Sequence, residues 1–183
     1  MNKRIVVTGM GALTPLGCGV EQIWQRLLAG QSGIRRLPEE LIGDLAISIG
    51  GQVQDRDQDP QAGFDPDALL APKEQRKMDR FILFALAAAE EALVQAGWHP
   101  ETAEEQERTA TIIASGVGGF PAIAEAVRTT DSKGPRRLSP FTIPSLSALR
   151  GQCRLTTSAR LKSSSRVSHS TGTPSGALRC LGL

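Results

Sequence analysis

Glycine-rich turns that follow two β-prone segments are the first residues whose spacing could perform chemistry. Gly9-Met10-Gly11 follows the β-branched segment 4–8, which is the position of a dinucleotide-binding turn. Such a turn needs a third glycine and a helix that begins directly at the pyrophosphate. Thr14 stands at the third position and Pro15 interrupts the expected helix. We therefore do not predict a nucleotide site.

A second glycine-rich turn, residues 115–119, follows the β-prone segment 109–114. This turn lacks the Lys-Ser/Thr pair of a phosphate-binding loop. Glycines in such a place are typical of a tight turn or of close backbone packing. Two interpretations of Val117 stay open: a side chain of the hydrophobic core, or the lining of a pocket beside the strand end, where α/β proteins bind ligands.

Thiols and imidazoles are few. Three cysteines are an odd count in a long chain, which argues against a disulfide framework. Cys153 and Cys180 have no neighbours that would lower a thiol pKa, so we interpret both as incidental thiols. His99 precedes a proline in a connection after Gly97 and is expected to be a solvated loop residue. We predict no metal site and no cofactor.

Three segments have the apolar spacing of helices. The first runs from Val20 to Leu28 and stops near Gly30, and the second runs from about Glu74 to Ala96 and stops at Gly97. The second is apolar all round over residues 81–89, which predicts burial on more than one side. A third helix begins at Phe120.

Shorter signals complete the expected architecture. Asp65-Pro66 has the pattern of an N-cap followed by a first-turn proline, and a strand is possible around residues 46–49. Residues 4–8 and 109–114 are predicted to be buried strands because they are rich in β-branched residues and end in glycine. Strand, glycine-rich turn and helix, used twice, predict a layered α/β fold.

The composition excludes several classes of protein. The chain has 183 residues, 40% hydrophobic and 22% charged, which is typical of a soluble globular domain. With no Tyr, five Phe and two Trp, base stacking on aromatic side chains is not expected, and we predict no nucleic-acid partner. The longest apolar run is too short for a membrane span, which needs about 20 residues, and no signal peptide is visible. We predict a cytoplasmic protein without membrane insertion.

The charges divide the chain into two pieces. Residues 1–131 hold all 19 acidic residues and have a net charge of −7, whereas residues 132–183 hold nine Lys and Arg and no acid. From Ser145 onward, 13 of 39 residues are Ser or Thr. We therefore predict a domain over residues 1–144 and a basic Ser/Arg-rich tail over residues 145–183, with the boundary near Pro144.

Five motifs in the same order resemble the N-terminal half of a β-ketoacyl-acyl-carrier-protein synthase, the elongating condensing enzyme of type II fatty acid synthesis. They are Arg4 to Gly11 with Thr14-Pro15-Leu16-Gly17, Trp24 to Ile34, Lys73 to Phe81, Ser115 to Gly119, and Gly134 to Phe141. Each motif alone is weak, but their shared order and spacing are specific. The resemblance covers roughly residues 1–145, which is about a third of a full family member.

The resemblance implies a thiolase-like layered α/β fold, of which this chain has an incomplete N-terminal half. It also implies a homodimer, an acyl carrier protein as partner, and an acyltransferase activity. In this family an acyl group is transferred to a cysteine and then condensed with malonyl-acyl carrier protein after decarboxylation. That chemistry uses a nucleophilic thiolate, two histidines and an oxyanion hole.

The sequence departs from the family pattern where the nucleophile is expected. The family's Thr-Ala-Cys turn would fall in residues 164–176, which contain no cysteine; Cys153 comes too early and Cys180 too late. The run that begins at His169 is similar to a later family motif, either by chance or through an internal deletion. We predict no catalytic residues in this chain: a truncated, inactive synthase or, alternatively, a non-catalytic dimerisation or interaction module.

The resemblance assigns roles to six residues. Val117, Phe141 and Thr142 match positions that line the acyl-chain pocket, although the family often has an aromatic residue where Thr142 stands. Arg76, Lys77 and Arg80 form a basic cluster on which an acidic carrier protein could dock. The competing interpretation is a solvated helix face that pairs with Glu74 and Asp79.

The tail allows three explanations. Residues 145–183 have no apolar periodicity and their basic residues are scattered, as out-of-frame translation of GC-rich coding sequence would produce. A natural basic tail that binds RNA, a membrane or an acidic partner is the second explanation, although the charges form no organised face. A deletion that fused a late motif onto an early half is the third.

Overall fold

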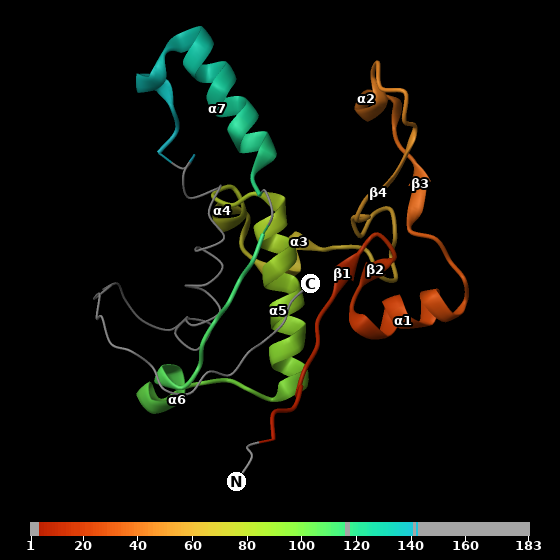
Figure 1. Ribbon diagram of the computed structural model, residues 1–183, viewed down its shortest axis with the longest axis vertical. Coiled ribbons are helices and arrows are strands. Elements are labelled where there is room, and N and C mark those ends of the chain that lie inside the picture. Colours follow the sequence, from red (N-terminus) through yellow and green to blue (C-terminus); the bar gives the residue numbers. More distant parts are fainter. Residues whose placement is uncertain (1–3, 116–117, 141, 143–183) are drawn as a thin grey trace.

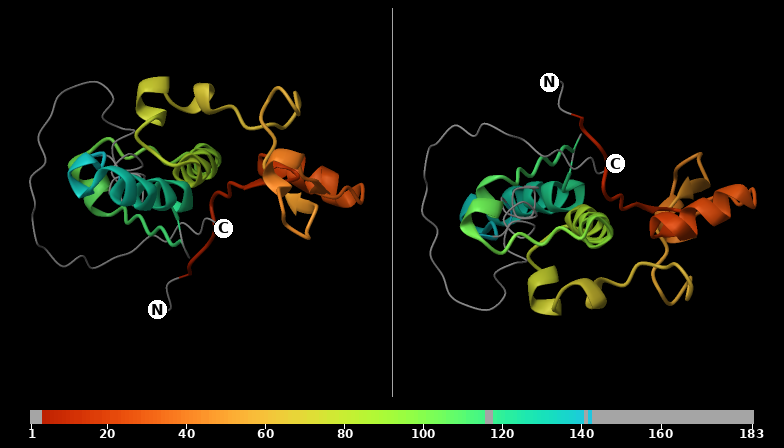
Figure 2. Two further views of the ribbon diagram at one scale, coloured as in Figure 1. Left: turned by 90° about the horizontal axis from the view of Figure 1, so that it is seen from above. Right: turned by 90° about the horizontal axis from the view of Figure 1, so that it is seen from below.

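A computed structural model describes residues 4–115, 118–140 and 142 of the chain. Its centre is the long helix α5 (Arg80–Ala96). Helix α1 and the two small strand pairs lie on one side of α5, while helices α6 and α7 lie on the other (Figure 1, Figure 2). None of the described helices is long and apolar enough to cross a membrane.

The strands of the described part form two antiparallel pairs. Strand β1 (Leu13–Thr14) pairs with β2 (Gly17–Cys18), and β3 (Ile34–Arg36) pairs with β4 (Ile49–Gly51). The other elements are helices: α1 (Val20–Leu28), α2 (Glu39–Ile42), α3 (Pro66–Leu69), α4 (Pro72–Gln75), α6 (Ala103–Glu107), α7 (Phe120–Lys133) and the 3₁₀ turn η1 (Pro135–Arg137).

The hydrophobic core of the described part gathers around the first half of α5. Its buried members are Phe64, Leu70, Ile82, Leu83 and Leu86. Ile82 is the most deeply buried of them, at 1% exposed. The rings of Phe64 and Phe84 meet edge to face with centroids 5.2 Å apart, an arrangement that the ring quadrupoles favour. The chain before α3 is thereby fixed to the central helix.

The long predicted helix is confirmed at its C-terminal end and wrong at its start. Gly97 ends α5 in a left-handed conformation, at φ 60°, as the stop signal indicated. The helix does not begin at Glu74, because α4 ends at Gln75 and α5 begins only at Arg80. The Asp79 side chain accepts a hydrogen bond from the Arg80 N–H, so an N-cap separates the two helices.

Other helix predictions are confirmed. Helix α1 spans Val20–Leu28, and α7 begins at Phe120. Asp65 caps α3, since its carboxylate accepts hydrogen bonds from the N–H groups of Asp67 and Ala68 at 3.0 and 3.1 Å. These elements are set by capping residues and apolar spacing within a few positions of the chain, so they can be predicted from the sequence alone.

Both predicted buried strands are wrong for this structure. Residues 4–8 and 109–114 are extended without strand pairing, and Ile5 is 94% and Ile112 60% exposed. A buried parallel strand needs neighbouring strands that satisfy its backbone and helices that cover its faces, and the described residues supply no such neighbours. The strand considered around residues 46–49 is confirmed only at its end, because β4 begins at Ile49.

Candidate functional site

The first glycine-rich turn packs against the backbone of α5. A Cβ atom on Gly9 would overlap the carbonyl oxygen of Ala92, and one on Gly11 would overlap that of Ala88. Two extended residues advance by about 6.6 Å and four helical residues by about 6 Å, so the glycine pair and the alanine pair match in spacing. The N-terminal segment therefore lies along α5 (Figure 1).

Polar side chains of α5 hold this segment in place. The carboxylate of Glu91 accepts hydrogen bonds from the N–H groups of Ala12 at 3.0 Å and Val20 at 2.7 Å. The Gln95 side-chain oxygen accepts one from the Met10 N–H at 2.6 Å. Because Val20 is the first residue of α1, Glu91 also joins that helix to α5. The glycines and carboxylate of this region act in packing, and no helix opens at Gly11 as a dinucleotide site requires.

The second turn also makes a close backbone contact. A Cβ on Gly118 would lie 2.5 Å from Cζ of the Phe81 ring, so only glycine fits there without displacing the ring. Gly119 has φ 71° and precedes α7. The interpretation as a close-packing turn is confirmed at Gly118. Val117, the predicted acyl-pocket residue of this turn, lies outside the described residues.

The other two predicted pocket residues follow η1. Thr142 is half-buried, and its N–H donates to the carbonyl oxygen of Ser139 at 3.0 Å. Phe141 lies outside the described residues. The structure therefore does not test the predicted acyl pocket of Val117, Phe141 and Thr142.

The predicted docking cluster surrounds the start of α5. The Lys77 ammonium pairs with Glu74 at 2.6 Å, as the solvated-face interpretation expected. Arg80 pairs not with Asp79 but with Asp55, at 2.7 Å, and its guanidinium lies 5.2 Å from the centroid of the Phe84 ring. Arg76 is exposed. The three cations lie near one another, and two of them are partly neutralised.

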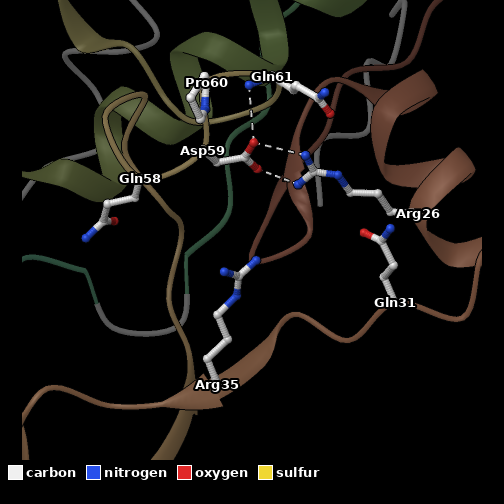
Figure 3. Close-up of a pocket in the computed structure, with 7 residues that line it drawn as sticks. All are labelled: Arg26, Gln31, Arg35, Gln58, Asp59, Pro60 and Gln61. Carbon is white, nitrogen blue, oxygen red and sulfur yellow. Dashed lines mark hydrogen bonds and ion pairs between the residues drawn. The ribbon is translucent and has the colours of Figure 1, made fainter.

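A cavity that sequence reasoning missed lies between α1, β3 and the loop after β4. It has a volume of about 390 Å³ and is lined by Arg26, Gln31, Arg35, Gln58, Asp59, Pro60 and Gln61 (Figure 3). The guanidinium of Arg26 holds Asp59 with two hydrogen bonds, Nη1 to Oδ2 at 2.5 Å and Nη2 to Oδ1 at 3.0 Å. Arg26 Nη1 also donates to the carbonyl oxygen of Leu16 at 2.7 Å.

The ion pair between Arg26 and Asp59 changes the pKa of both groups. The hydrogen bond from Arg26 is the main cause that lowers the pKa of Asp59; together with the N–H groups of Ala62 and Gln61, and against the opposing effect of burial, it brings that pKa to about 2. The hydrogen bond to Asp59 likewise raises the pKa of Arg26. Arg26 and Asp59 are 33 residues apart, so no local pattern could have indicated the pair. Asp59 stays ionised at neutral pH and fixes α1 to the loop.

The cysteine and histidine of the described part do not form a catalytic pair. Burial, followed by the nearby carboxylates of Asp59 and Glu91, raises the pKa of Cys18 to about 11, so this thiol is a poor nucleophile at neutral pH. His99 is exposed in the connection after α5, as predicted. Cys153, Cys180 and His169 lie outside the described residues. Among the described residues, no three His, Cys, Asp or Glu side chains are placed to hold a metal ion.

Comparison with known proteins defines the class of this protein. The family model for the β-ketoacyl synthase N-terminal domain matches residues 2–165, so the chain belongs to the β-ketoacyl synthase family. The 3-oxoacyl-[acyl-carrier-protein] synthase 2 of Rhizobium meliloti strain 1021 is 46% identical over 142 residues, which cover 78% of this chain and 34% of that protein. The chain thus spans about a third of the length of the curated relatives that it matches.

Solved structures show the same fold. A β-ketoacyl synthase from Burkholderia phymatum STM815 matches with a TM-score of 0.67 and 23% identity, over 85% of this chain and 37% of that one. AntDE:AntF, a type II polyketide acyl carrier protein in complex with its ketosynthase, matches with a TM-score of 0.61 and 21% identity, over 86% and 39%. The predicted thiolase-like α/β fold is confirmed by this likeness.

Proposed function

We propose that this chain is the N-terminal part of a 3-oxoacyl-acyl-carrier-protein synthase that elongates fatty acids by decarboxylative condensation. The observation that carries this proposal is the 46% identity to the Rhizobium meliloti synthase over 78% of the chain. The proposed substrates of the whole enzyme are an acyl group and malonyl carried on acyl carrier protein. The reaction requires no resident cofactor, because loss of carbon dioxide from the malonyl group leaves the electron pair of the broken C–C bond on the α-carbon, and this carbanion attacks the acyl thioester and expels its thiolate.

The described residues contribute a scaffold to such an enzyme. Gly9 and Gly11 let the N-terminal segment lie on α5, and Gly118 lets the second turn lie on Phe81. Val117 would lie next to that contact in sequence, and an apolar side chain there suits a fatty acyl chain, since each buried CH₂ contributes about 0.8 kcal/mol. Phe141 and Thr142 would complete this pocket, in part from the second subunit of a homodimer.

The carrier protein would dock on the basic cluster at the start of α5. Arg76 and Arg80 are both exposed, but Arg80 pairs with Asp55, so Arg76 is the cation most available to an acidic partner. We expect Arg76→Glu to weaken binding of acyl carrier protein about tenfold, measured by fluorescence anisotropy at low salt. Arg36→Glu, the same change at an exposed arginine of β3, is the matched control. Equal losses in the two variants would show that only net charge matters.

The 183-residue chain alone is proposed to lack condensing activity. Neither Cys153 nor Cys180 stands in a Thr-Ala-Cys turn, and the Cys18 thiol is held in its neutral form by its raised pKa. The test is a condensation assay with acyl- and malonyl-acyl carrier protein on the purified chain, followed by mass spectrometry of the product. A control purification from cells that carry an empty vector measures host synthase. Ketoacyl product above that control would contradict the proposed inactivity.

The chain would then act as an interaction module, the second candidate function. The observation that favours this role is the exposed apolar segment 4–8, where Val6 is 65% and Val7 77% exposed. Unpaired extended segments of this kind bind other strands. Co-purification of a full-length synthase with the tagged chain is the expected result. Recovery of the tagged chain without a synthase would contradict this role.

Residues 145–183 are proposed to be out-of-frame translation, with the boundary near Pro144. The proposal rests on the loss of all acidic residues and of apolar periodicity in this stretch, although the family match runs to residue 165. Reading the gene in its other two frames tests it. A Thr-Ala-Cys turn followed by a long family-like continuation is expected, and stop codons in both frames would overturn the proposal.

A further inference from the structure

We propose that the cavity between β3 and the Arg26–Asp59 pair binds the phosphate group of a small polar ligand. The cavity, defined above by its lining residues, is about 390 Å³ in volume, which falls at the small end of the range of ligand sites. This inference concerns a region away from α5 and does not depend on the proposed function.

Arg35 is the residue that would meet the ligand. Its guanidinium points from β3 into the cavity toward the Arg26–Asp59 pair (Figure 3). Among the described residues no carboxylate pairs with it, and its one hydrogen bond is from Nη1 to the side-chain oxygen of Gln54 at 3.2 Å. The remaining N–H groups of its planar fork are available to an oxyanion.

The side of the cavity opposite Arg35 is formed by Arg26 and Asp59, whose side chains are held in place by hydrogen bonds. Arg26 is held by two hydrogen bonds to Asp59 and one to the Leu16 carbonyl, so it cannot turn toward Arg35. The Asp59 carboxylate also accepts the N–H groups of Gln61 and Ala62 at 3.2 Å. The charge of Asp59 is balanced by Arg26. The net charge of the three charged side chains that line the cavity, Arg26, Arg35 and Asp59, is therefore +1. The cavity therefore favours an anion over a cation.

The amide side chains select a phosphate group over an aromatic or apolar ligand. Gln31 and Gln61 line the cavity beside the two arginines, and Pro60 is the single apolar residue of the lining. None of the described residues that line the cavity is aromatic, so none of them offers a ring for stacking. A tetrahedral phosphate accepts hydrogen bonds from several directions, which suits donors that come from the loop after α1, from β3 and from the loop after β4 better than a planar carboxylate does.

Arg36 provides a matched control. It follows Arg35 directly in β3, and because successive side chains of a strand point to opposite faces, it is turned away from the cavity. Both arginines are exposed. Arg35→Gln and Arg36→Gln remove the same charge from the same strand, so a difference between them reports the cavity and not the overall charge.

The test is a titration of the ¹⁵N-labelled 183-residue chain with sodium phosphate at neutral pH and constant ionic strength. We expect saturable shifts of the amide signals of Gln31, Arg35 and Gln61 with a Kd of about 1–10 mM. Arg35→Gln should weaken binding roughly tenfold, and Arg36→Gln less than twofold. Equal effects of the two variants, the absence of saturable shifts, or equal binding of acetate would each overturn the proposal.

Discussion

Helix α5 and the N-terminal segment are both rich in aliphatic side chains, yet they lie in opposite environments. Ile82 of α5 is 1% exposed, whereas Ile5 of the segment is 94% exposed. The helix satisfies its own backbone hydrogen bonds and needs only side chains from nearby loops to cover it. An extended segment needs partner strands for its backbone and two covering layers for its side chains.

The difference shows which part of this family's fold is encoded locally. Phe64, Leu70 and the first half of α5 form a core from residues that lie within 30 positions of one another. Segments 4–8 and 109–114 would pair with strands that the described residues do not supply. The stability of the described part should therefore depend strongly on α5 and weakly on the exposed segments.

The largest loss of stability is expected from Ile82→Ala. Removal of a fully buried isoleucine leaves a cavity in the core, which should lower the free energy of unfolding by about 4 kcal/mol. Urea denaturation followed by circular dichroism measures this change. Val94→Ala is the control on the same helix, since Val94 is 61% exposed. Similar losses for the two variants would show that α5 is not packed as described.

A somewhat smaller loss is expected from Gly11→Ala. The new methyl group would overlap the backbone carbonyl of Ala88, so the N-terminal segment must move away from α5, at a cost of about 3 kcal/mol. Gly50→Ala is the matched control, because its Cβ would meet only the flexible side chain of Leu37, at 3.1 Å. The same urea titration compares the two. Equal stability of both variants would contradict the close contact between the segment and α5.

An acid titration should reveal the Arg26–Asp59 pair. The pKa of Asp59 is lowered from 3.8 to about 2 in the folded chain. A lowered carboxyl pKa stabilises the folded state fully above the unfolded pKa, and this contribution is lost as the pH falls from about 4 to about 2. The loss should amount to about 2 kcal/mol.

Arg26→Gln tests the cause of this pH dependence. Without the guanidinium the pKa of Asp59 returns toward its ordinary value, so the variant should be less stable at neutral pH and should lose less on acidification. Urea denaturation of both proteins at neutral pH and at pH values below 4 measures the difference. Parallel stability curves for the two proteins would exclude the pair as the source.

The sequence predicted those features that depend on neighbouring residues. The Asp65 cap, the ends of α1 and the Gly97 stop were predicted because capping and helical periodicity operate over a few positions. The break before α5 was missed although Asp79 carries a capping side chain, because the apolar residues Met78 and Phe81 continued the helical spacing across it. Helical periodicity therefore predicted that α5 exists, whereas its first residue depends on the hydrogen bond from the Arg80 N–H to the Asp79 carboxylate.

The candidate sites made of neighbouring residues could likewise be predicted from the sequence, whereas the cavity made of distant residues could not. The packing role of Gly118 could be predicted from the glycine-rich turn alone, and Arg76, Lys77 and Arg80 were found because they are adjacent in sequence. The cavity of Arg26, Arg35 and Asp59 was missed because its members come from α1, β3 and a loop. Only the folded chain brings such residues together, and nothing in the sequence around Arg26 indicated its partner Asp59.

The smallest effect on stability is expected where the apolar side chains are exposed. The double change Ile5→Thr and Val7→Thr removes little buried surface, since these side chains are 94% and 77% exposed, so the free energy of unfolding should change by less than about 0.5 kcal/mol. Exposed aliphatic residues on an unpaired extended segment promote association with other strands, so the same variant should self-associate less in sedimentation velocity experiments. A loss of stability comparable to that of Ile82→Ala would mean that segment 4–8 is buried in the folded chain. The segment and α5 would then not lie in opposite environments.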